Sequence, residues 1–125
     1  MKVFRIGYLN YPWLFTVDLP VFLFLGADWD ERSLHLMPFL EEISQKYDQK
    51  LIVGYVEVEY ACKIFTELGI AEIPSVIGID SGKILKPVLG VRYKRDLENY
   101  VNYIFGVLPY SPIDQYKKER GTKHV

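Results

Sequence analysis

The chain has 125 residues, half of them hydrophobic, which is enough for one domain with a substantial apolar core. Its 15 basic and 16 acidic residues give a formal net charge of −1, so no global field attracts nucleic acid or an anionic membrane, and we expect neither as a partner. A single cysteine, Cys62, excludes an intrachain disulfide and an all-cysteine metal site within one chain.

The apolar stretch from Trp13 to Ala27 lies near two basic residues, as the core of a secretory signal peptide would. Asp18 and Pro20 interrupt it, however, and no small-residue cleavage pattern follows. No run approaches the ~20 apolar residues that a membrane-spanning helix needs. We therefore interpret the stretch as part of the fold and expect a cytoplasmic protein.

The first half of the chain predicts three strands. Weak alternation indicates the first over residues 2–6, and an irregular or short helical connection follows over 8–17. The uninterrupted apolar run 20–26 is typical of a strand buried on both faces. A helix over 31–47 then leads to a strand over 51–58, and this order implies a parallel pair joined by a right-handed crossover.

The predicted helix from Glu31 to Tyr47 has one apolar face. We expect Asp28 and Glu31 to form its capping box, and we expect Pro38 to kink it because proline removes an amide and clashes with the preceding turn. The apolar residues that recur at helical spacing are Leu34, Met37, Leu40, Ile43 and Tyr47.

The second half predicts a short helix and a hairpin. The helix covers 61–68 and ends at Gly69. Strands over 75–79 and 84–89 flank a turn-rich segment and form the antiparallel hairpin. Pro87 cannot donate to a neighbouring strand, so the second strand of the hairpin is expected at an edge of the sheet.

The last predicted helix carries the clearest apolar stripe, formed by Leu97, Tyr100, Val101, Ile104 and Phe105. A proline-containing segment with several basic residues follows. We therefore divide the chain into a domain, residues 1–106, and a C-terminal tail, residues 107–125. The tail is expected to pack on its own domain or on a second copy through Leu108, Tyr110, Ile113 or Tyr116.

Four segments resemble the thioredoxin family. They are Gly26-Ala27-Asp28-Trp29-Asp30-Glu31-Arg32-Ser33, Met37-Pro38, Leu68-Gly69-Ile70-Ala71-Glu72-Ile73-Pro74-Ser75 and Val88-Leu89-Gly90. In order, they resemble the active-site entry Ala-x-Trp-Cys-x-x-Cys, the helix proline, the cis-proline loop and the last-strand glycine. The resemblance covers roughly residues 21–105. It implies an α/β fold, a thioredoxin-like three-layer sandwich in which a mixed central sheet of four to five strands has helices on both faces.

The sequence departs from the family at the dithiol itself. By the resemblance, Asp30 stands at the position of the attacking cysteine and Ser33 at that of the resolving cysteine. Phe24 stands at a buried aspartate of many thioredoxins, and Tyr55 at the lysine often found beside it. Neither a carboxylate nor an unactivated hydroxyl supports thiol–disulfide exchange. The resemblance thus implies a redox-inactive chain with no catalytic residues here, and Asp30 and Ser33 also suit a helix start.

In thioredoxins the tryptophan, the cis-proline loop and the glycine form a shallow groove that holds an extended peptide. The matching positions are Trp29, Ile73, Pro74, Gly90 and Val91. The resemblance implies a peptide groove at these residues and a cis bond between Ile73 and Pro74. A structural interpretation stands beside it, in which Pro74 fixes the loop, Gly90 avoids a clash and Trp29 packs.

Other chemical candidates are few. Cys62 opens the short helix, where a helix N-terminus lowers a thiol pKa, although free cysteines are commonly small buried hydrophobes. Glu31 and His35 are helical neighbours that, with Asp28 or Asp30, suggest a metal site, but their spacing is common on solvated helices. We predict no metal and no cofactor.

Our preferred interpretation is a redox-inactive, non-enzymatic module that binds a protein or peptide through the former active-site groove and the terminal aromatic residues. Those aromatics also suit a homodimer formed through the termini. The alternative is an enzyme: a thiol-dependent, thioredoxin-like oxidoreductase, or one that binds a thiol cofactor, using Cys62 or the Asp30 and Ser33 region.

Overall fold

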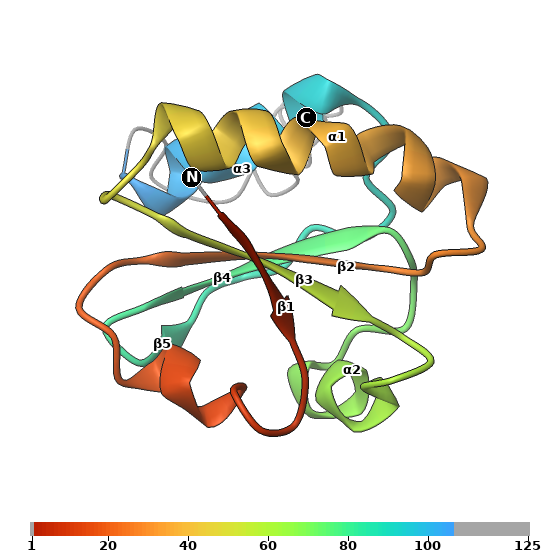
Figure 1. Ribbon diagram of the computed structural model, residues 1–125, viewed down its shortest axis with the longest axis horizontal. Coiled ribbons are helices and arrows are strands. Elements are labelled where there is room, and N and C mark those ends of the chain that lie inside the picture. Colours follow the sequence, from red (N-terminus) through yellow and green to blue (C-terminus); the bar gives the residue numbers. More distant parts are fainter. Residues whose placement is uncertain (1, 107–125) are drawn as a thin grey trace, which may run out of the picture.

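A five-stranded sheet in the order β1-β3-β2-β4-β5 forms the centre of the protein (Figure 1). The computed structural model describes residues 2–106, so the predicted contacts of the tail lie outside the described residues. The strands are β1 (Val3–Ile6), β2 (Val21–Gly26), β3 (Ile52–Glu57), β4 (Ser75–Asp80) and β5 (Lys83–Ile84). The helices are α1 (Glu31–Lys46), α2 (Cys62–Leu68) and α3 (Lys94–Ile104), with a 3₁₀ helix at Pro12–Phe15.

The sheet is mixed. Strands β1, β3 and β2 run in parallel, whereas β4 pairs antiparallel with β2 and β5 antiparallel with β4. The three parallel strands therefore end at the same side of the sheet, at Ile6, Gly26 and Glu57, which we call the carboxyl edge. A two-residue turn joins β4 to β5, with positive φ at Ser81 and Gly82, as a tight hairpin requires.

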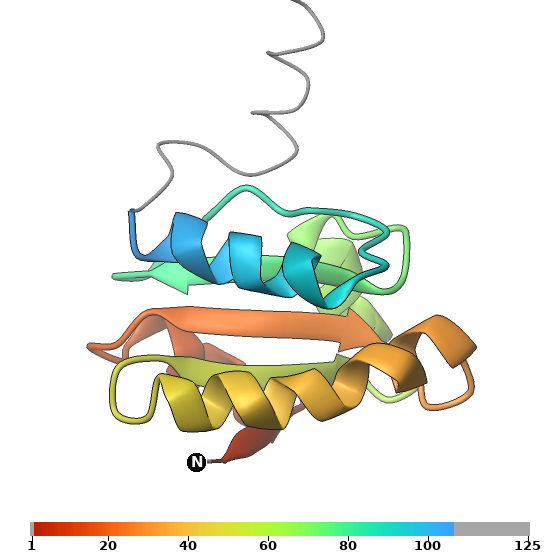
Figure 2. The same ribbon diagram turned by 90° about the horizontal axis from the view of Figure 1, so that it is seen from above.

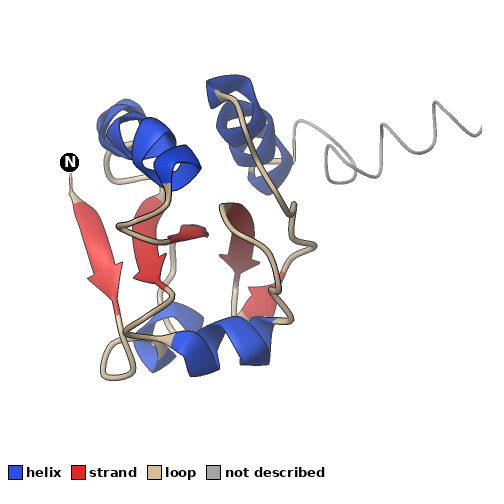
Figure 3. Cartoon of the chain, turned by 90° about the vertical axis from the view of Figure 1, so that its right-hand side faces the viewer, coloured by secondary structure: helices blue, strands red, loops and turns tan. Residues whose placement is uncertain are grey.

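Helices cover both faces of the sheet (Figure 3). On one face α1 packs over β3 and α3 over β4 (Figure 2). On the other face lie α2 and the 3₁₀ helix (Figure 1). Two apolar clusters separate the layers, and the largest buried side chains include Phe22, Phe24 and Tyr100 towards α1 and α3, and Leu14, Leu23 and Leu25 on the other side. The predicted α/β sandwich with a mixed sheet and helices on both faces is confirmed.

Tyr100 shows how the last helix is fixed to the sheet. Its ring is fully buried, and its hydroxyl donates to the Lys86 carbonyl at 2.6 Å and accepts from Gly78 N–H at 2.8 Å. Burial raises the pKa of Tyr100, so the hydroxyl keeps its proton. The apolar stripe of α3 thus includes a polar group whose partners lie on β4 and on the segment after β5.

Three local predictions are wrong in detail. The N-cap of α1 is Asp30 rather than Asp28. The apolar face of α1 buries Leu36, whereas Leu34 is about half exposed. The second hairpin strand is shorter than residues 84–89, because β5 covers two residues and Val88 forms only an isolated bridge to Val76. Strand β5 lies at the sheet edge, but Pro87 falls beyond it.

Candidate functional site

The connection between β2 and α1 carries the Asp30 and Ser33 pair. Asp30 has extended backbone geometry, and its carboxylate accepts hydrogen bonds from Ser33 N–H at 2.9 Å and from the Ser33 hydroxyl at 2.8 Å, both at Oδ2. The fully buried Ser33 hydroxyl accepts in turn from Ala27 N–H at 3.2 Å. These bonds satisfy the free amides of a helix start and of the link before it.

The floor beneath this pair is apolar and tight. Phe24 is fully buried, and its ring centroid lies 6.1 Å from that of Tyr55 on the adjacent strand. A Cβ atom at Gly26 would lie 2.6 Å from the Ser33 hydroxyl oxygen, so only glycine fits there. The Ser33 side chain thus occupies a closed position in the fold.

The Pro74 loop lies beside the end of β2, because Ser75 pairs with Leu25 across β4 and β2. The Ile73–Pro74 peptide bond is cis. The Pro74 carbonyl accepts from Val91 N–H at 2.8 Å, and the Ser75 hydroxyl accepts from Gly90 N–H at 3.3 Å. Pro74, Gly90 and Val91 are therefore held together as the resemblance implies.

The five groove candidates differ in what they offer to a ligand. Trp29 is 62% exposed on the β2–α1 connection, and Ile73 is half-buried. Among the described residues, neither the N–H nor the carbonyl of Ile73 forms a hydrogen bond. Val91 is buried, so only its backbone borders the loop. Gly90 has a φ of 65°, and a Cβ there would collide with the Glu72 carboxylate.

Comparison with solved structures identifies the fold. The thioredoxin of Malassezia sympodialis (Mala s 13) superposes with a TM-score of 0.74 over 82% of this chain and 90% of that protein, at 22% sequence identity. The chain has a thioredoxin-like fold. The thioredoxin of Rickettsia typhi is 27% identical over 85 residues, which cover 68% of this chain and 81% of the relative. That of Buchnera aphidicola is 29% identical over 94 residues, 75% of this chain and 82% of the relative.

The chain is thus similar in sequence to thioredoxins over about two thirds to three quarters of its length. No family model matches it. In this thioredoxin-like fold, Asp30 and Ser33 lie at the start of α1, directly after β2. The chain contains a single cysteine, which lies on α2.

Cys62, the alternative thiol, is exposed and is not part of the Asp30 and Ser33 pair. Its Sγ lies 3.9 Å from the hydroxyl of Tyr8, which also accepts from Lys63 N–H at 3.0 Å. Within residues 2–106 no three histidine, cysteine or acidic side chains are grouped closely enough to hold a metal ion. The part of the chain that the structure describes contains no helix that is long and apolar enough to cross a membrane.

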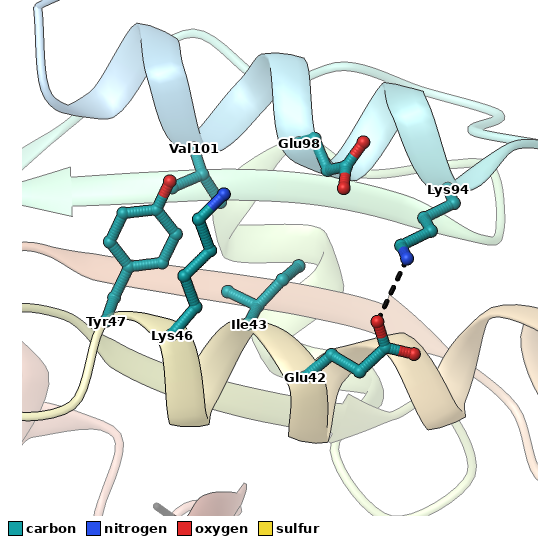
Figure 4. A pocket seen from close by; sticks show the side chains of 7 residues that line it. All are labelled: Glu42, Ile43, Lys46, Tyr47, Lys94, Glu98 and Val101. Atoms are coloured by element: carbon teal, nitrogen blue, oxygen red, sulfur yellow. Dashed lines mark hydrogen bonds and ion pairs between the residues drawn. The ribbon is translucent and has the colours of Figure 1, made fainter.

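Among the described residues, cavities also lie outside the predicted sites. One, of about 330 Å³, lies between α1 and α3 and is crossed by the 2.9 Å ion pair of Lys94 with Glu42 (Figure 4). Another, of about 760 Å³, lies at the carboxyl edge, and we call it the edge pocket. Its lining residues are Arg5, Ile6, Gly7, Tyr8, Leu9, Asn10, Asp28, Glu57 and Tyr60.

The sequence analysis missed the edge pocket. Its residues come from the ends of parallel strands and from the three connections that follow these strands, and no motif marks them. Ligands commonly bind at the carboxyl ends of parallel strands. The polar residues Asn10, Asp28 and Glu57 lie at or just after those ends and could have indicated the pocket. Tyr8 offers a further signal, because it is one of the aromatic residues near the N-terminus that no predicted helix or strand includes.

Proposed function

We propose that this thioredoxin-like protein is a redox-inactive module that binds an extended protein segment beside Pro74. The binding surface, here called the Pro74 groove, consists of Trp29, Ile73, Pro74, Gly90 and Val91. One observation carries the proposal: the backbone N–H and carbonyl of Ile73 form no hydrogen bond with any described residue. The adjacent Pro74 is fixed by the hydrogen bond from Val91 N–H. Main-chain groups of this kind pair with an added strand.

The lack of redox activity is inferred from the start of α1. Exchange requires a thiolate that attacks a disulfide and a second thiol that resolves the mixed disulfide. Asp30 and Ser33 supply neither, and their polar atoms are already used in hydrogen bonds to each other and to Ala27. We infer that this pair stabilises the helix and the link instead of reacting.

Trp29 supplies the apolar contact that the groove needs. A tryptophan that remains 62% exposed leaves a large apolar area in water, and aromatic residues of this kind dominate binding energies at interfaces. A segment paired with the Ile73 backbone would cover part of this ring. Backbone pairing would then supply the orientation, and Trp29 most of the affinity.

Selection of peptides from a displayed random library against the full chain tests the proposal. Peptides that bind the groove are expected to bind Trp29→Ala at least about tenfold more weakly, because one buried aromatic contact accounts for more than 1.4 kcal/mol. Ile84→Ala is the control, since Ile84 is a half-exposed apolar residue on β5 that lies outside both the groove and the edge pocket. Bound peptide should also slow amide exchange at Ile73. Failure to enrich any peptide, or equal binding to both variants, contradicts the groove.

The enzymatic alternative uses the exposed thiol of Cys62. Reduction of a protein disulfide by wild type and by Cys62→Ser distinguishes the two functions. We expect no turnover above background for either protein. Turnover that disappears in Cys62→Ser would replace the binding module with a single-thiol oxidoreductase.

A further inference from the structure

The edge pocket lies where the three parallel strands end. Arg5 lies on β1, and the loop Gly7–Asn10 follows this strand. Asp28 follows β2, Glu57 is the last residue of β3, and Tyr60 follows β3. Its volume of about 760 Å³ is within the range of sites that hold small molecules or several side chains. It shares no lining residue with the Pro74 groove.

The walls of the edge pocket are held in place by hydrogen bonds. The Asn10 side chain accepts from Gly7 N–H at 2.8 Å and donates to the Arg5 carbonyl at 3.0 Å. Tyr11 N–H closes the same loop by donating to the Gly7 carbonyl at 3.0 Å. Tyr8 is fixed to the start of α2 through its hydroxyl. The pocket therefore exists before any ligand enters, which lowers the entropy cost of binding.

Charge in the edge pocket is not balanced. Arg5 pairs with Asp28 at 3.4 Å and lies 5.3 Å from the ring centroid of Tyr55, so its charge is already matched. Glu57 is 2% exposed, and its carboxylate accepts from Asp28 N–H at 3.1 Å and Glu59 N–H at 2.7 Å. No basic side chain among the described residues pairs with it.

A carboxylate has about four acceptor sites, and the two backbone amides use only part of that capacity on Glu57. Buried charges are normally paired, because removing a carboxylate from water costs free energy. Burial and the hydrogen bond donated to Asp28 raise the pKa of Tyr55, so this phenol stays neutral and adds no charge. A cationic ligand would supply the pairing that Glu57 lacks.

The rim of the edge pocket is apolar and exposed. Leu9 is 100% exposed, Tyr60 is 71% exposed and Tyr8 is about half exposed. Exposed apolar groups around a pocket with a polar floor are typical of a binding site. Tyrosine rings also attract cations over their faces.

We propose that the edge pocket binds an arginine side chain of a partner protein, flanked by apolar residues. Arginine fits this site better than lysine, because its planar guanidinium is weakly hydrated, donates to a carboxylate in a fork and stacks on aromatic rings. Its stem and its apolar neighbours would cover Leu9 and Tyr60. The proposal stands independently of the Pro74 groove.

Titration of the isotope-labelled full chain with a capped Leu-Arg-Leu peptide, followed by amide chemical shifts, tests this proposal. Shifts are expected at Gly7, Leu9 and Glu59. The same peptide with citrulline, which keeps the shape but lacks the charge, should bind at least about tenfold more weakly. A Leu-Glu-Leu peptide should leave these amides unchanged.

Substitutions of exposed side chains show whether the peptide binds at the edge pocket, and they leave the buried core unchanged. Leu9→Ser removes a fully exposed side chain and should weaken binding of the arginine peptide several-fold. Ile84→Ser, at a half-exposed apolar residue on β5, should not weaken it. Trp29→Ala should bind this peptide as wild type does, which separates the edge pocket from the Pro74 groove. Equal affinity for the citrulline peptide, shifts confined to the Pro74 groove, or no shifts at millimolar peptide would each overturn the proposal.

Discussion

Asp30→Ala is the most direct test of the structural role that we assign to the start of α1. In the folded chain, one oxygen of the Asp30 carboxylate accepts from both the backbone and the hydroxyl of Ser33. The substitution removes the N-cap of a 16-residue helix and leaves a fully buried hydroxyl without its acceptor.

The expected cost follows from these two losses. Loss of an N-cap side chain costs about 0.5–2 kcal/mol. Loss of the buried hydrogen bond from the Ser33 hydroxyl adds roughly 1 kcal/mol. We therefore expect Asp30→Ala to lower the free energy of unfolding by about 1.5–3 kcal/mol. Ser33→Ala should cost about 1–3 kcal/mol, because it leaves the buried Ala27 N–H without a partner.

The two substitutions share one hydrogen bond, so their effects should not add. The double variant is expected to lose about 1 kcal/mol less than the sum of the single variants. Urea unfolding of the wild type, both single variants and the double variant, followed by far-ultraviolet circular dichroism, measures this coupling. Asp30→Asn is the control, because asparagine also caps helices and should retain most of the stability. An Asp30→Ala variant within about 0.5 kcal/mol of wild type, or fully additive losses, would refute the capping role.

Two further substitutions test other parts of the fold. The double variant Asp30→Cys with Ser33→Cys should form an intrachain disulfide, detected by thiol titration, because its spacing at a helix start is that of Cys-x-x-Cys. Its turnover of protein disulfides should stay poor, since Phe24 offers no proton acceptor beneath the site. A folded variant that cannot oxidise would contradict this placement of the dithiol. Tyr100→Phe should lower stability in urea by about 1–3 kcal/mol, because it leaves Gly78 N–H buried and unpaired, and a neutral effect would contradict that role.

The strands and the last helix could be predicted because their signals are local. The apolar run of β2 has no polar interruption, and all six of its residues are buried. The stripe of α3 recurs at helical spacing, and four of its five predicted residues are buried, with Phe105 partly exposed and stacked on Tyr47. In both elements the pattern along the chain is enough to decide which side chains leave water.

The capping residue of α1 could not be chosen in this way. Asp28 and Asp30 are both short acidic residues before a helix, and local preference does not distinguish them. The choice depends on neighbouring strands, because Asp28 receives the Tyr55 hydroxyl from β3 at 2.9 Å and pairs with Arg5 from β1. These partners are distant in the sequence, so only the sheet order reveals them.

The edge pocket was missed for the same reason, since its residues are brought together only by the sheet order. Glu57 is the clearest case. It is the last residue of the largely apolar strand β3. Its buried carboxylate is stabilised by hydrogen bonds from the backbone N–H groups of Asp28 and Glu59. A composition or motif search treats such a residue as an ordinary surface charge.

The short link between β2 and α1 joins these observations. Ala27 and Asp30 form hydrogen bonds with Ser33, and Asp28 lines the edge pocket. Trp29 is exposed, and we assign it to the proposed Pro74 groove. In a thioredoxin the same link must also present a reactive thiol. In this chain the Asp30 carboxylate accepts two hydrogen bonds from Ser33, and under the proposed function it takes no part in thiol exchange, which leaves recognition to Asp28 and Trp29. Adjacent residues of one link would then face two different binding surfaces, which makes the carboxyl edge the part of the molecule where partners should be sought.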